Sequence, residues 1–268
     1  MKTLEGKVSV IIPALNEEKR IEKSLLEIIK TFDDFGCKYE IILFDDGSND
    51  KTYETAKTLS LKINPGRLIV KRNPYNFGKG RALKKAFRYA TGDYIVWLDA
   101  DMDLHPLQIQ TFFDIMRIDN ADCVIGSKFH PNSVMSYPLQ RRIISLAYYL
   151  LIRTLFNLPC HDTQTGIKLF KSEVLKEVFP RILVKKFAFD LEVLVNIHHL
   201  GFKIAEAPII LNSQRRYSRI GLKSIYTTLW DTLAVFYRMY ILKYYDRIDY
   251  HRNKNAIKQF RRVRKQVS

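Results

Sequence analysis

Short apolar runs that alternate with amphipathic stretches are the feature of this sequence that most limits its fold. Such runs occupy residues 8–15, 39–46, 67–72, 94–98 and 122–129, and helical patterns follow several of them. Strands that alternate with helices favour a mainly parallel sheet with helices on both faces. We therefore expect an α/β fold, in which ligands bind at the carboxyl ends of the strands.

Three carboxylates, Asp99, Asp101 and Asp103, directly follow the run at residues 94–98. On an extended backbone, side chains two residues apart point the same way, so the three are expected to converge on one point. Their mutual repulsion is costly unless a cation neutralises it, and Mg²⁺ or Mn²⁺ takes carboxylate oxygens and bridges to substrate phosphates. The alternative is an acidic turn that caps a helix expected to begin near His105.

Size and cysteine content bound the class of protein. A chain of 268 residues, 47% of them hydrophobic, can bury a full core as one α/β domain with or without an appendage. Cys37, Cys123 and Cys160 are widely separated, so we expect reduced thiols in a cytosolic protein. With no signal-peptide pattern and no long apolar window, we expect neither secretion nor a transmembrane helix.

The formal net charge of +16 indicates a polyanionic partner: a nucleic acid, an anionic membrane surface or a phosphorylated substrate. Only the charge favours a nucleic-acid-binding module. The carboxylate cluster would repel a phosphate backbone unless metal were present, so we expect no nucleic-acid partner. A nucleotidyltransferase, which is also α/β with paired aspartates, stays open.

Two aromatic, amphipathic helices are expected at residues 137–159 and 224–245, and a tail rich in Lys and Arg follows at residues 252–265. Both helices are too short and too charged to span a bilayer, but they suit its interface, and the tail suits anionic headgroups. Ordinary core packing is the alternative. We expect a catalytic domain at residues 1–223, which includes the first helix, and an appendage at residues 224–268.

Further polar clusters lie at the ends of expected strands and helices. Residues 13–17 and 44–48 suit either a nucleobase and ribose or a simple turn with a helix cap. Lys79 lies between two glycines at a helix N-terminus, which suits an anion, but the spacing is that of neither a P-loop nor a dinucleotide fingerprint. Asp190 begins another helix, where an aspartate is expected to be the N-cap. Residues 214–219 form a basic loop, either solvated or closing over a diphosphate.

Six of these segments, IIPALNEE, DDGSND, NFGKGRA, LDADMDLHP, DTQTGIKLF and FDLEVL, occur in the order typical of one enzyme family. From about residue 8 to 223 the chain resembles the family 2 glycosyltransferases, and more narrowly the dolichyl-phosphate mannose and glucose synthases. The resemblance implies a GT-A fold, a nucleotide-diphosphate-sugar donor, a divalent metal and a polyprenyl (dolichyl) phosphate acceptor.

The resemblance also implies roles for individual residues. The donor would be bound by Pro13, Leu15, Glu17, Phe44, Asp46, Lys79, Ala100, Arg216 and Lys223. Asp101 would hold the metal, with Asp99 and Asp103 beside it. Lys128, where the family commonly has arginine, and Arg142 would grip the acceptor phosphate. Asp162 would act as a base or an orienting group.

The function implied is the inverting transfer of a hexose from UDP-glucose or GDP-mannose to a polyprenyl phosphate, by a protein peripheral to the cytoplasmic face of a membrane. The segment DTQTGIKLF favours the glucosyl branch. A phosphate monoester has a second pKa of about 6, so its attacking oxygen is already anionic near pH 7. The alternative acceptor is a soluble saccharide or metabolite.

Overall fold

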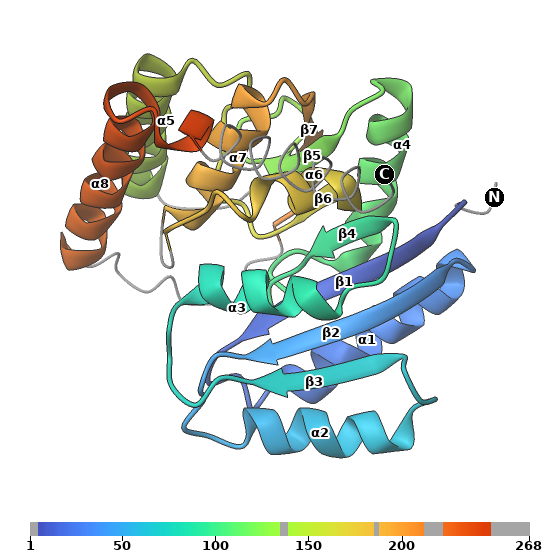
Figure 1. Cartoon of the computed structure of the whole chain (residues 1–268). Coiled ribbons are helices and arrows are strands. Elements are labelled where there is room, and N and C mark those ends of the chain that lie inside the picture. Colours follow the sequence, from blue (N-terminus) through green and yellow to red (C-terminus); the bar gives the residue numbers. More distant parts are fainter. Residues whose placement is uncertain (1–4, 135–138, 185–187, 212–221, 248–268) are drawn as a thin grey trace, which may run out of the picture.

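The computed structural model describes residues 5–134, 139–184, 188–211 and 222–247. Its centre is a seven-stranded sheet with the strand order β3-β2-β1-β4-β6-β5-β7, covered by helices on both faces (Figure 1). The strands are β1 Lys7–Ala14, β2 Lys38–Asp45, β3 Leu68–Arg72, β4 Tyr94–Trp97, β5 Cys123–Ser127, β6 Lys168–Lys171 and β7 Ile204–Pro208. The five runs singled out in the sequence are the first five of these strands.

The sheet is mainly parallel, as expected. Strands β1, β2, β3 and β4 are parallel to their neighbours in that half of the sheet, and β5 is parallel to β7. The exception is β6, which runs antiparallel to both β4 and β5. The carboxyl ends of β1, β2 and β4 therefore lie at one edge, where the polar segments of the sequence follow.

The helices are α1 Ile21–Phe35, α2 Thr52–Lys62, α3 Lys79–Ala86, α4 Ile109–Ile118, α5 Leu139–Phe156, α6 Ser172–Val178, α7 Phe189–His199 and α8 Leu222–Phe236. Short 3₁₀ segments, η1 Phe87–Tyr89 and η2 Pro106–Gln108, continue α3 and precede α4, and a π-helical turn, η3 Tyr237–Ile241, continues α8. Helices α1, α2 and α4 pack on one face of the sheet, and α3, α5, α6, α7 and α8 pack on the other.

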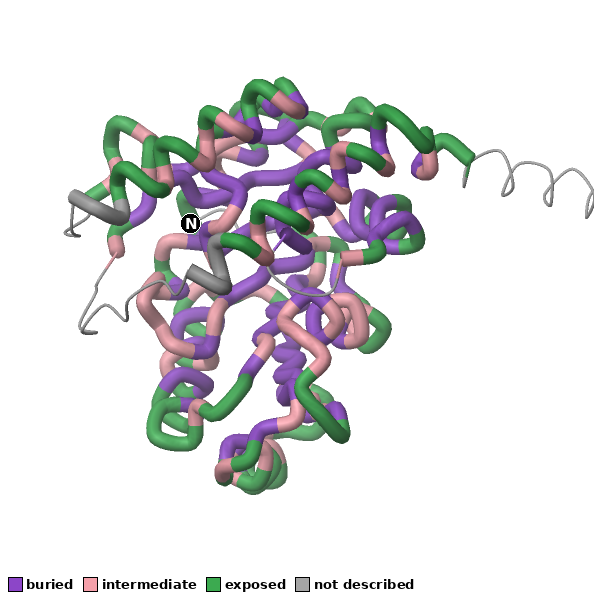
Figure 2. Tube along the Cα trace, turned by 90° about the vertical axis from the view of Figure 1, so that its left-hand side faces the viewer, coloured by how far each residue is buried: buried purple, intermediate pink, exposed green. Residues whose placement is uncertain are grey.

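Alternate residues of the central strands face opposite layers. Ile11 of β1 belongs to the core under α3 and α7, whereas Val10 and Ile12 belong to the core under α1 and α4. Because both faces are covered, both kinds of position must be apolar, and the strand appears in the sequence as one continuous run. Buried positions accordingly run along the strands and exposed ones along the outer sides of the helices (Figure 2).

The first helix begins some residues after β1 ends. Asn16 has a positive φ of 56°, and α1 begins at Ile21. From there Leu25, Ile28 and Phe32 are buried at helical spacing. The helix ends at Gly36, whose φ of 65° is the left-handed conformation that glycine adopts at little cost.

The two aromatic helices both enter the core and carry exposed apolar residues. Phe156 of α5 and Val235 of α8 are buried, and the Phe156 ring lies 6.1 Å from the ring of Phe236. In the same helices Ile143 and Trp230 are 67% and 64% exposed. No helix in the described ranges is long and apolar enough to cross a bilayer. The three cysteines are free, as expected.

Candidate active site

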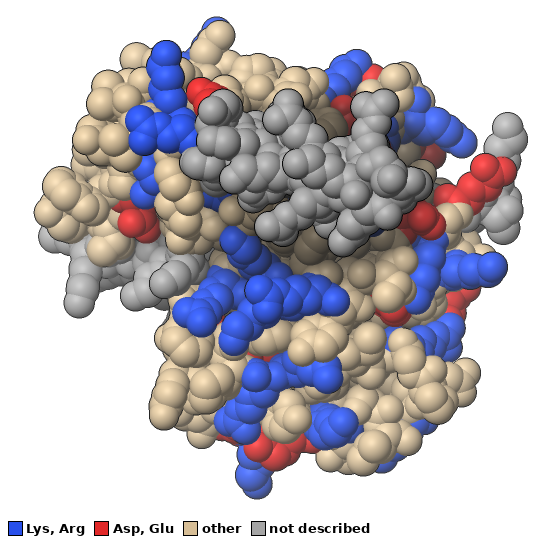
Figure 3. Space-filling model, in the orientation of Figure 1, with Lys and Arg blue, Asp and Glu red and all other residues tan. Residues whose placement is uncertain are grey.

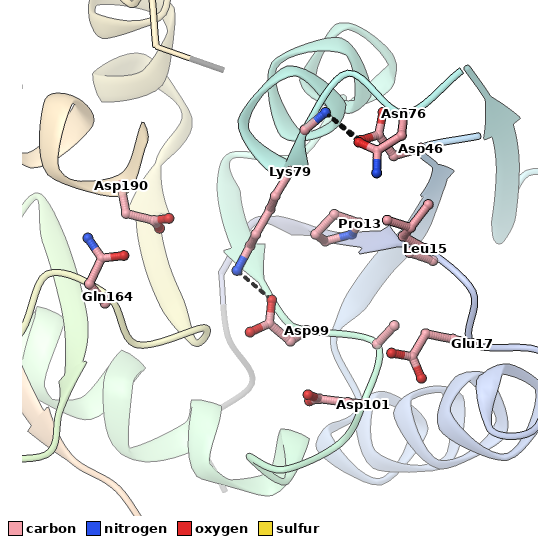
Figure 4. A pocket seen from close by; sticks show the side chains of 13 residues that line it. Pro13, Leu15, Glu17, Asp46, Asn76, Lys79, Asp99, Asp101, Gln164 and Asp190 are labelled. Carbon is pink, nitrogen blue, oxygen red and sulfur yellow. Dashed lines mark hydrogen bonds and ion pairs between the residues drawn. The ribbon is translucent and has the colours of Figure 1, made fainter. Parts of the chain in front are cut away.

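A cavity of about 800 Å³ lies at the carboxyl ends of β1, β2 and β4, a size that suits a nucleotide-sized ligand. Figure 4 shows its lining side chains, which come from the loops after these strands, the start of α3, the turn before β6 and the start of α7. Eight residues proposed from the sequence line it: Pro13, Leu15, Glu17, Asp46, Lys79, Asp99, Ala100 and Asp101.

One wall of the cavity is built by the ends of β1 and β2. Pro13 and Leu15 lie there beside Asp46, which is only 3% exposed (Figure 4). The Asp46 carboxylate accepts hydrogen bonds from the Asn73 side-chain amide at 2.7 Å and from the Gly78 backbone N–H at 2.7 Å. These bonds fix the carboxylate and join the end of β2 to the N-terminus of α3.

Lys79 crosses the cavity from the first turn of α3 to the loop after β4. Its Nζ atom donates to Asp99 Oδ1 at 2.6 Å (Figure 4). Burial by itself lowers the pKa of the Lys79 ammonium, but the charges of Asp99, Asp190 and Asp101 outweigh it and raise that pKa above its usual value. Lys79 is therefore a permanent positive charge inside the cavity.

Asp99 is held from behind by the turn that precedes β6. A Cβ atom added to Gly166 would lie 1.9 Å from Asp99 Oδ2, so only glycine lets this backbone approach the carboxylate so closely. The sequence DTQTG thus has a packing role beside β4 that its composition did not reveal.

The three carboxylates after β4 do not converge as expected. The chain turns at Ala100 and Asp101, and Met102 has a positive φ of 61°, so the extended-backbone argument ends at Asp99. Asp103 donates its N–H to Asp101 Oδ1 at 3.2 Å and is not among the residues that line the cavity. Among the described residues, no three His, Cys, Asp or Glu side chains form a group that could hold a metal ion.

The charge of the cavity nevertheless suits a cation bound together with a phosphorylated ligand. Among its described lining residues five are acidic, Glu17, Asp46, Asp99, Asp101 and Asp190, and one, Lys79, is basic. Such a lining repels a diphosphate unless a cation accompanies it. Mg²⁺ is commonly held by one or two carboxylates plus substrate phosphates, so Asp101 and Asp99 fit an ion of this kind without a third protein carboxylate.

Five further lining residues were not proposed from the sequence: Ala14, Asn76, Gly78, Gln164 and Asp190. Gln164 and Asp190 lie across the cavity from Pro13 and Leu15 (Figure 4). The expectation that Asp190 is an N-cap is wrong, since α7 is preceded by Ala188 and has no side-chain cap. Asp190 instead accepts a hydrogen bond at 2.6 Å from Lys168 Nζ, a lysine that is 1% exposed. Only the fold could reveal this partner, because the two residues lie on different elements.

A second, smaller cavity of about 50 Å³ adjoins the first, and Gln164 lines both. Lys128 and Asp162 line it, with Lys128 Nζ 3.5 Å from Asp162 Oδ2. Asp162 is 4% exposed, and its carboxylate also accepts from Thr165 Oγ1 at 2.5 Å and from the Gln164 N–H at 3.0 Å. So engaged, Asp162 is suited to orienting Lys128 and the turn.

The remaining residues proposed from the sequence lie elsewhere. Phe44 is 4% exposed and packs in the core with α3, away from the cavity lining. Arg142 is exposed on α5, one turn before Ser145, which lines the smaller cavity. Arg216 and the side chain of Lys223 lie outside the described residues.

Comparison with known proteins identifies relatives of the chain. Residues 9–179 match the family model described as Glycosyl transferase family 2. A dolichyl-phosphate beta-glucosyltransferase ALG5A of Trichomonas vaginalis is 32% identical over 253 residues, which cover 90% of this chain and 76% of the relative. A dolichyl-phosphate beta-glucosyltransferase of Dictyostelium discoideum is 32% identical over 213 residues, which cover 75% of this chain and 65% of the relative.

The glycosyltransferase AglD of Haloferax volcanii is 30% identical over 204 residues, which cover 75% of this chain. The chain spans about a third of that relative's length, 32%. Among solved structures, glucosyl-3-phosphoglycerate synthase from Mycobacterium tuberculosis, crystallised with Mn²⁺, uridine diphosphate and phosphoglyceric acid, superposes with a TM-score of 0.66. It is 22% identical, and the match covers 87% of this chain and 78% of that one. This likeness confirms the expected GT-A fold.

Proposed function

The chain belongs to glycosyl transferase family 2, and from this premise we propose that it moves a hexose from a nucleotide-diphosphate sugar to a polyprenyl (dolichyl) phosphate. Two relatives of 32% identity are dolichyl-phosphate beta-glucosyltransferases, which favours UDP-glucose over GDP-mannose as donor. The observation that carries the proposal is the pair of adjoining cavities, one acidic and nucleotide-sized, the other lined by Lys128, with Gln164 shared between them.

The lining of the larger cavity suggests how the donor lies. The base and ribose would occupy the wall of Pro13, Leu15 and Asp46, where apolar surface and a fixed carboxylate are available. The diphosphate would lie at the level of Lys79, and the hexose would reach toward Gln164 and Asp190 on the opposite wall (Figure 4). Carboxylate and amide side chains are suited to binding sugar hydroxyls.

A divalent cation, Mg²⁺ or Mn²⁺, would be held by Asp101 with Asp99 beside it, while Asp103 stays outside the cavity lining. When bound, it would neutralise the charge that develops on the leaving nucleoside diphosphate. Lys79 contributes positive charge to the same region, and Asp99 fixes the position of its ammonium group.

The acceptor phosphate would bind where the smaller cavity opens toward the hexose. Lys128 is the cation of that cavity, and Arg142 lies one turn from it along α5. An oxygen of the lipid phosphate attacks the anomeric carbon in line, the bond from that carbon to the diphosphate oxygen breaks, and the nucleoside diphosphate leaves with the electron pair. Because the attacking oxygen is already anionic near pH 7, the residues mainly position the two substrates, and Asp162 orients Lys128.

The acceptor's hydrocarbon chain calls for contact with a membrane, which helices α5 and α8 suit. Their exposed apolar residues include Ile143, Leu150, Trp230 and Leu233. The basic segment at residues 252–265, which lies outside the described residues, would add attraction to anionic lipids. We place the catalytic domain at residues 1–223 and the membrane appendage at residues 224–268, with the protein on the cytoplasmic face.

A donor screen tests the proposal. The protein is incubated with Mn²⁺ or Mg²⁺, a short-chain polyprenyl phosphate in detergent and UDP-glucose, UDP-N-acetylglucosamine or GDP-mannose, and release of the nucleoside diphosphate is followed. We expect release from UDP-glucose that requires the lipid phosphate, stops with EDTA and returns when Mn²⁺ is added in excess.

Matched variants of the same loop sharpen the screen. Asp101→Ala should abolish release, whereas Asp103→Ala, two residues away and outside the cavity lining, should retain most of it. Release that needs no lipid would leave a glycosyltransferase with a soluble acceptor. No release from any donor would refute the proposed reaction.

A further inference from the structure

A basic site lies on the outer side of α3 and η1, away from the large acidic cavity. It is a pocket of about 280 Å³, here called the α3 pocket, with two unlike walls. One wall carries the cations Arg81, Lys84, Lys85 and Arg88, and the other consists of Ile182, Leu183 and Val184 after α6. In Figure 3 Lys and Arg side chains gather over α3 on the face in view.

The helix geometry brings these four cations together on one side of α3 and η1. Lys84, Lys85 and Arg88 follow Arg81 by three, four and seven residues, which places the four on one side of the helix, while Ala82, Leu83 and Ala86 face the core. Like charges at this spacing repel each other and destabilise a helix. A cluster that opposes folding and has no compensating partner calls for a ligand.

The described residues supply no such partner for the cluster. None of them brings a carboxylate within 4.0 Å of the four cations, and the α3 pocket has no acidic residue in its described lining. The neutral contacts are Lys84 Nζ with the Ile182 carbonyl at 2.9 Å, Lys85 Nζ with Asn73 Oδ1 at 2.6 Å, and Arg81 stacked 4.1 Å from the centre of the Phe77 ring. These contacts hold the cations in place without neutralising them.

The nearby acid is Glu192, which is fully buried behind the apolar wall. Its carboxylate already accepts from the Leu183 and Val184 N–H groups, from Tyr245 Oη at 2.6 Å and from Arg238 at 3.1 Å. Burial and the neighbouring Arg88 lower the pKa of Lys84, although Glu192 raises it in part. The pocket therefore keeps a surplus of positive charge.

The shape and chemistry of the walls define the ligand class. Four cations suit phosphoryl oxygens, and arginine in particular binds them through two parallel hydrogen bonds. The facing wall is apolar, with Leu183 45% exposed, so the ligand suited to the pocket joins an anionic phosphoryl group to hydrocarbon. A phospholipid headgroup with the first part of its chains has this composition, whereas a free phosphorylated metabolite leaves the apolar wall uncovered.

The location agrees with this ligand class. Ala82 and Leu83 of α3, Phe156 of α5 and Val235 of α8 belong to one core cluster, so the three helices form one layer on the same face of the sheet. The α3 pocket therefore lies on the same side of the sheet as α5 and α8, which carry exposed apolar residues.

We propose that the α3 pocket binds the phosphoryl headgroup of an anionic membrane lipid and thereby adds a second membrane contact to that of α5 and α8. This inference rests on the membrane association in the proposed function. It adds a residue-level site for lipid charge, distinct from the cavities that would hold donor and acceptor.

The test measures binding to phosphatidylcholine vesicles with and without 30% phosphatidylglycerol by flotation in 0.1 M salt. The variant Arg81→Gln/Arg88→Gln removes two charges from the pocket, and Lys23→Gln/Lys30→Gln removes two exposed charges from α1 on the other face of the sheet. With each basic residue near the surface contributing about fivefold, the first variant should bind the anionic vesicles about 25-fold more weakly, and the control should bind nearly as the natural protein does.

A single substitution at the exposed Arg88, Arg88→Glu, keeps the test decisive if the double variant fails to fold. Equal binding of pocket and control variants would overturn the α3 pocket while leaving helices α5 and α8 as the contact. Failure of the unaltered protein to bind anionic vesicles would overturn both membrane contacts, the α3 pocket and helices α5 and α8.

One further measurement distinguishes a lipid headgroup from a soluble anion as the ligand of the α3 pocket. Another distinguishes failure of this inference from failure of the proposed reaction. Saturable binding of inorganic phosphate or pyrophosphate without vesicles, with loss of this binding in Arg81→Gln/Arg88→Gln, would assign the pocket to a soluble anion. That result would overturn the proposal that it binds a lipid headgroup. Sugar transfer to the short-chain acceptor in detergent should be equal in all variants. If the unaltered protein binds anionic vesicles but transfers no sugar, the proposed reaction is refuted and this inference stands.

Discussion

The buried pair of Lys168 and Asp190 gives the sharpest prediction about stability. Lys168 is 1% exposed, and its ammonium contacts Asp190 Oδ1 at 2.6 Å and the Thr165 carbonyl. The substitution Lys168→Met keeps much of the side-chain volume but leaves the Asp190 carboxylate without its cation. Breaking one partner of a buried pair costs about 3–5 kcal/mol, because a charge remains in a poorly solvated site.

A matched pair on the same strand isolates the effect of burial. Lys171, also in β6, pairs with Asp122 at 2.7 Å, but the two side chains are 30% and 23% exposed. For Lys171→Met we expect a loss of about 0.5 kcal/mol, typical of a solvent-exposed ion pair. The two variants change the same residue type and remove the same charge, so the difference between them measures burial.

Urea unfolding at pH 7 is the assay, with the slope of the transition compared between variants. At roughly 2–4 °C per kcal/mol, Lys168→Met should also lower the melting temperature by about 6–20 °C. The double variant Lys168→Met/Asp190→Asn removes both charges and should be more stable than Lys168→Met alone. A loss below about 1 kcal/mol for Lys168→Met, or a double variant no more stable than the single one, would refute the reasoning.

Three other predictions concern the cavity and the pH dependence of folding. Lys79→Met should weaken UDP binding by about 10- to 100-fold but leave uridine binding unchanged, because it removes a charged hydrogen-bond donor for the diphosphate; equal losses for both ligands in calorimetry would contradict this. Gly166→Ala should reduce transfer more than tenfold with little change in the circular-dichroism spectrum, since its Cβ would displace Asp99; full activity would show that the close approach is not needed. For Glu40, burial raises the pKa, but hydrogen bonds from Lys7, Ser9 and Thr91 bring it below its ordinary 4.5. The stabilisation is therefore present above pH 4.5 and lost as the pH falls below it, so Glu40→Gln should flatten the fall in unfolding free energy over that range, and parallel curves in urea titrations would be the contrary result.

Much of the fold followed from local pattern. The apolar runs of β1, β2 and β4 predicted strands because both faces of a covered sheet need apolar residues, and their order predicted a mainly parallel sheet. The same runs predicted where polar side chains gather, because the carboxyl ends of parallel strands lie at one edge of the sheet. Pro13, Asp46 and Asp99 were placed in the site on this ground together with the family resemblance.

The sequence failed where the backbone departs from a regular repeat. The spacing of Asp99, Asp101 and Asp103 predicted convergence only for an extended chain, and the positive φ of Met102 removes Asp103 from the cavity. Likewise the side chain of Phe44 points into the core, as the alternation along β2 requires. Phe44 therefore does not reach the cavity, although Asp46 is only two residues away in the sequence.

What the sequence by itself determined is the set of elements and the chemistry of the residues at their ends, since both depend on neighbours within a few positions. Only the tertiary structure decided which distant groups meet. It joined Lys168 to Asp190 and brought Gly166 against Asp99. It also set Ile182 against the cations of α3. These contacts arise from how helices and strands pack, and packing is set by the whole core rather than by any local stretch.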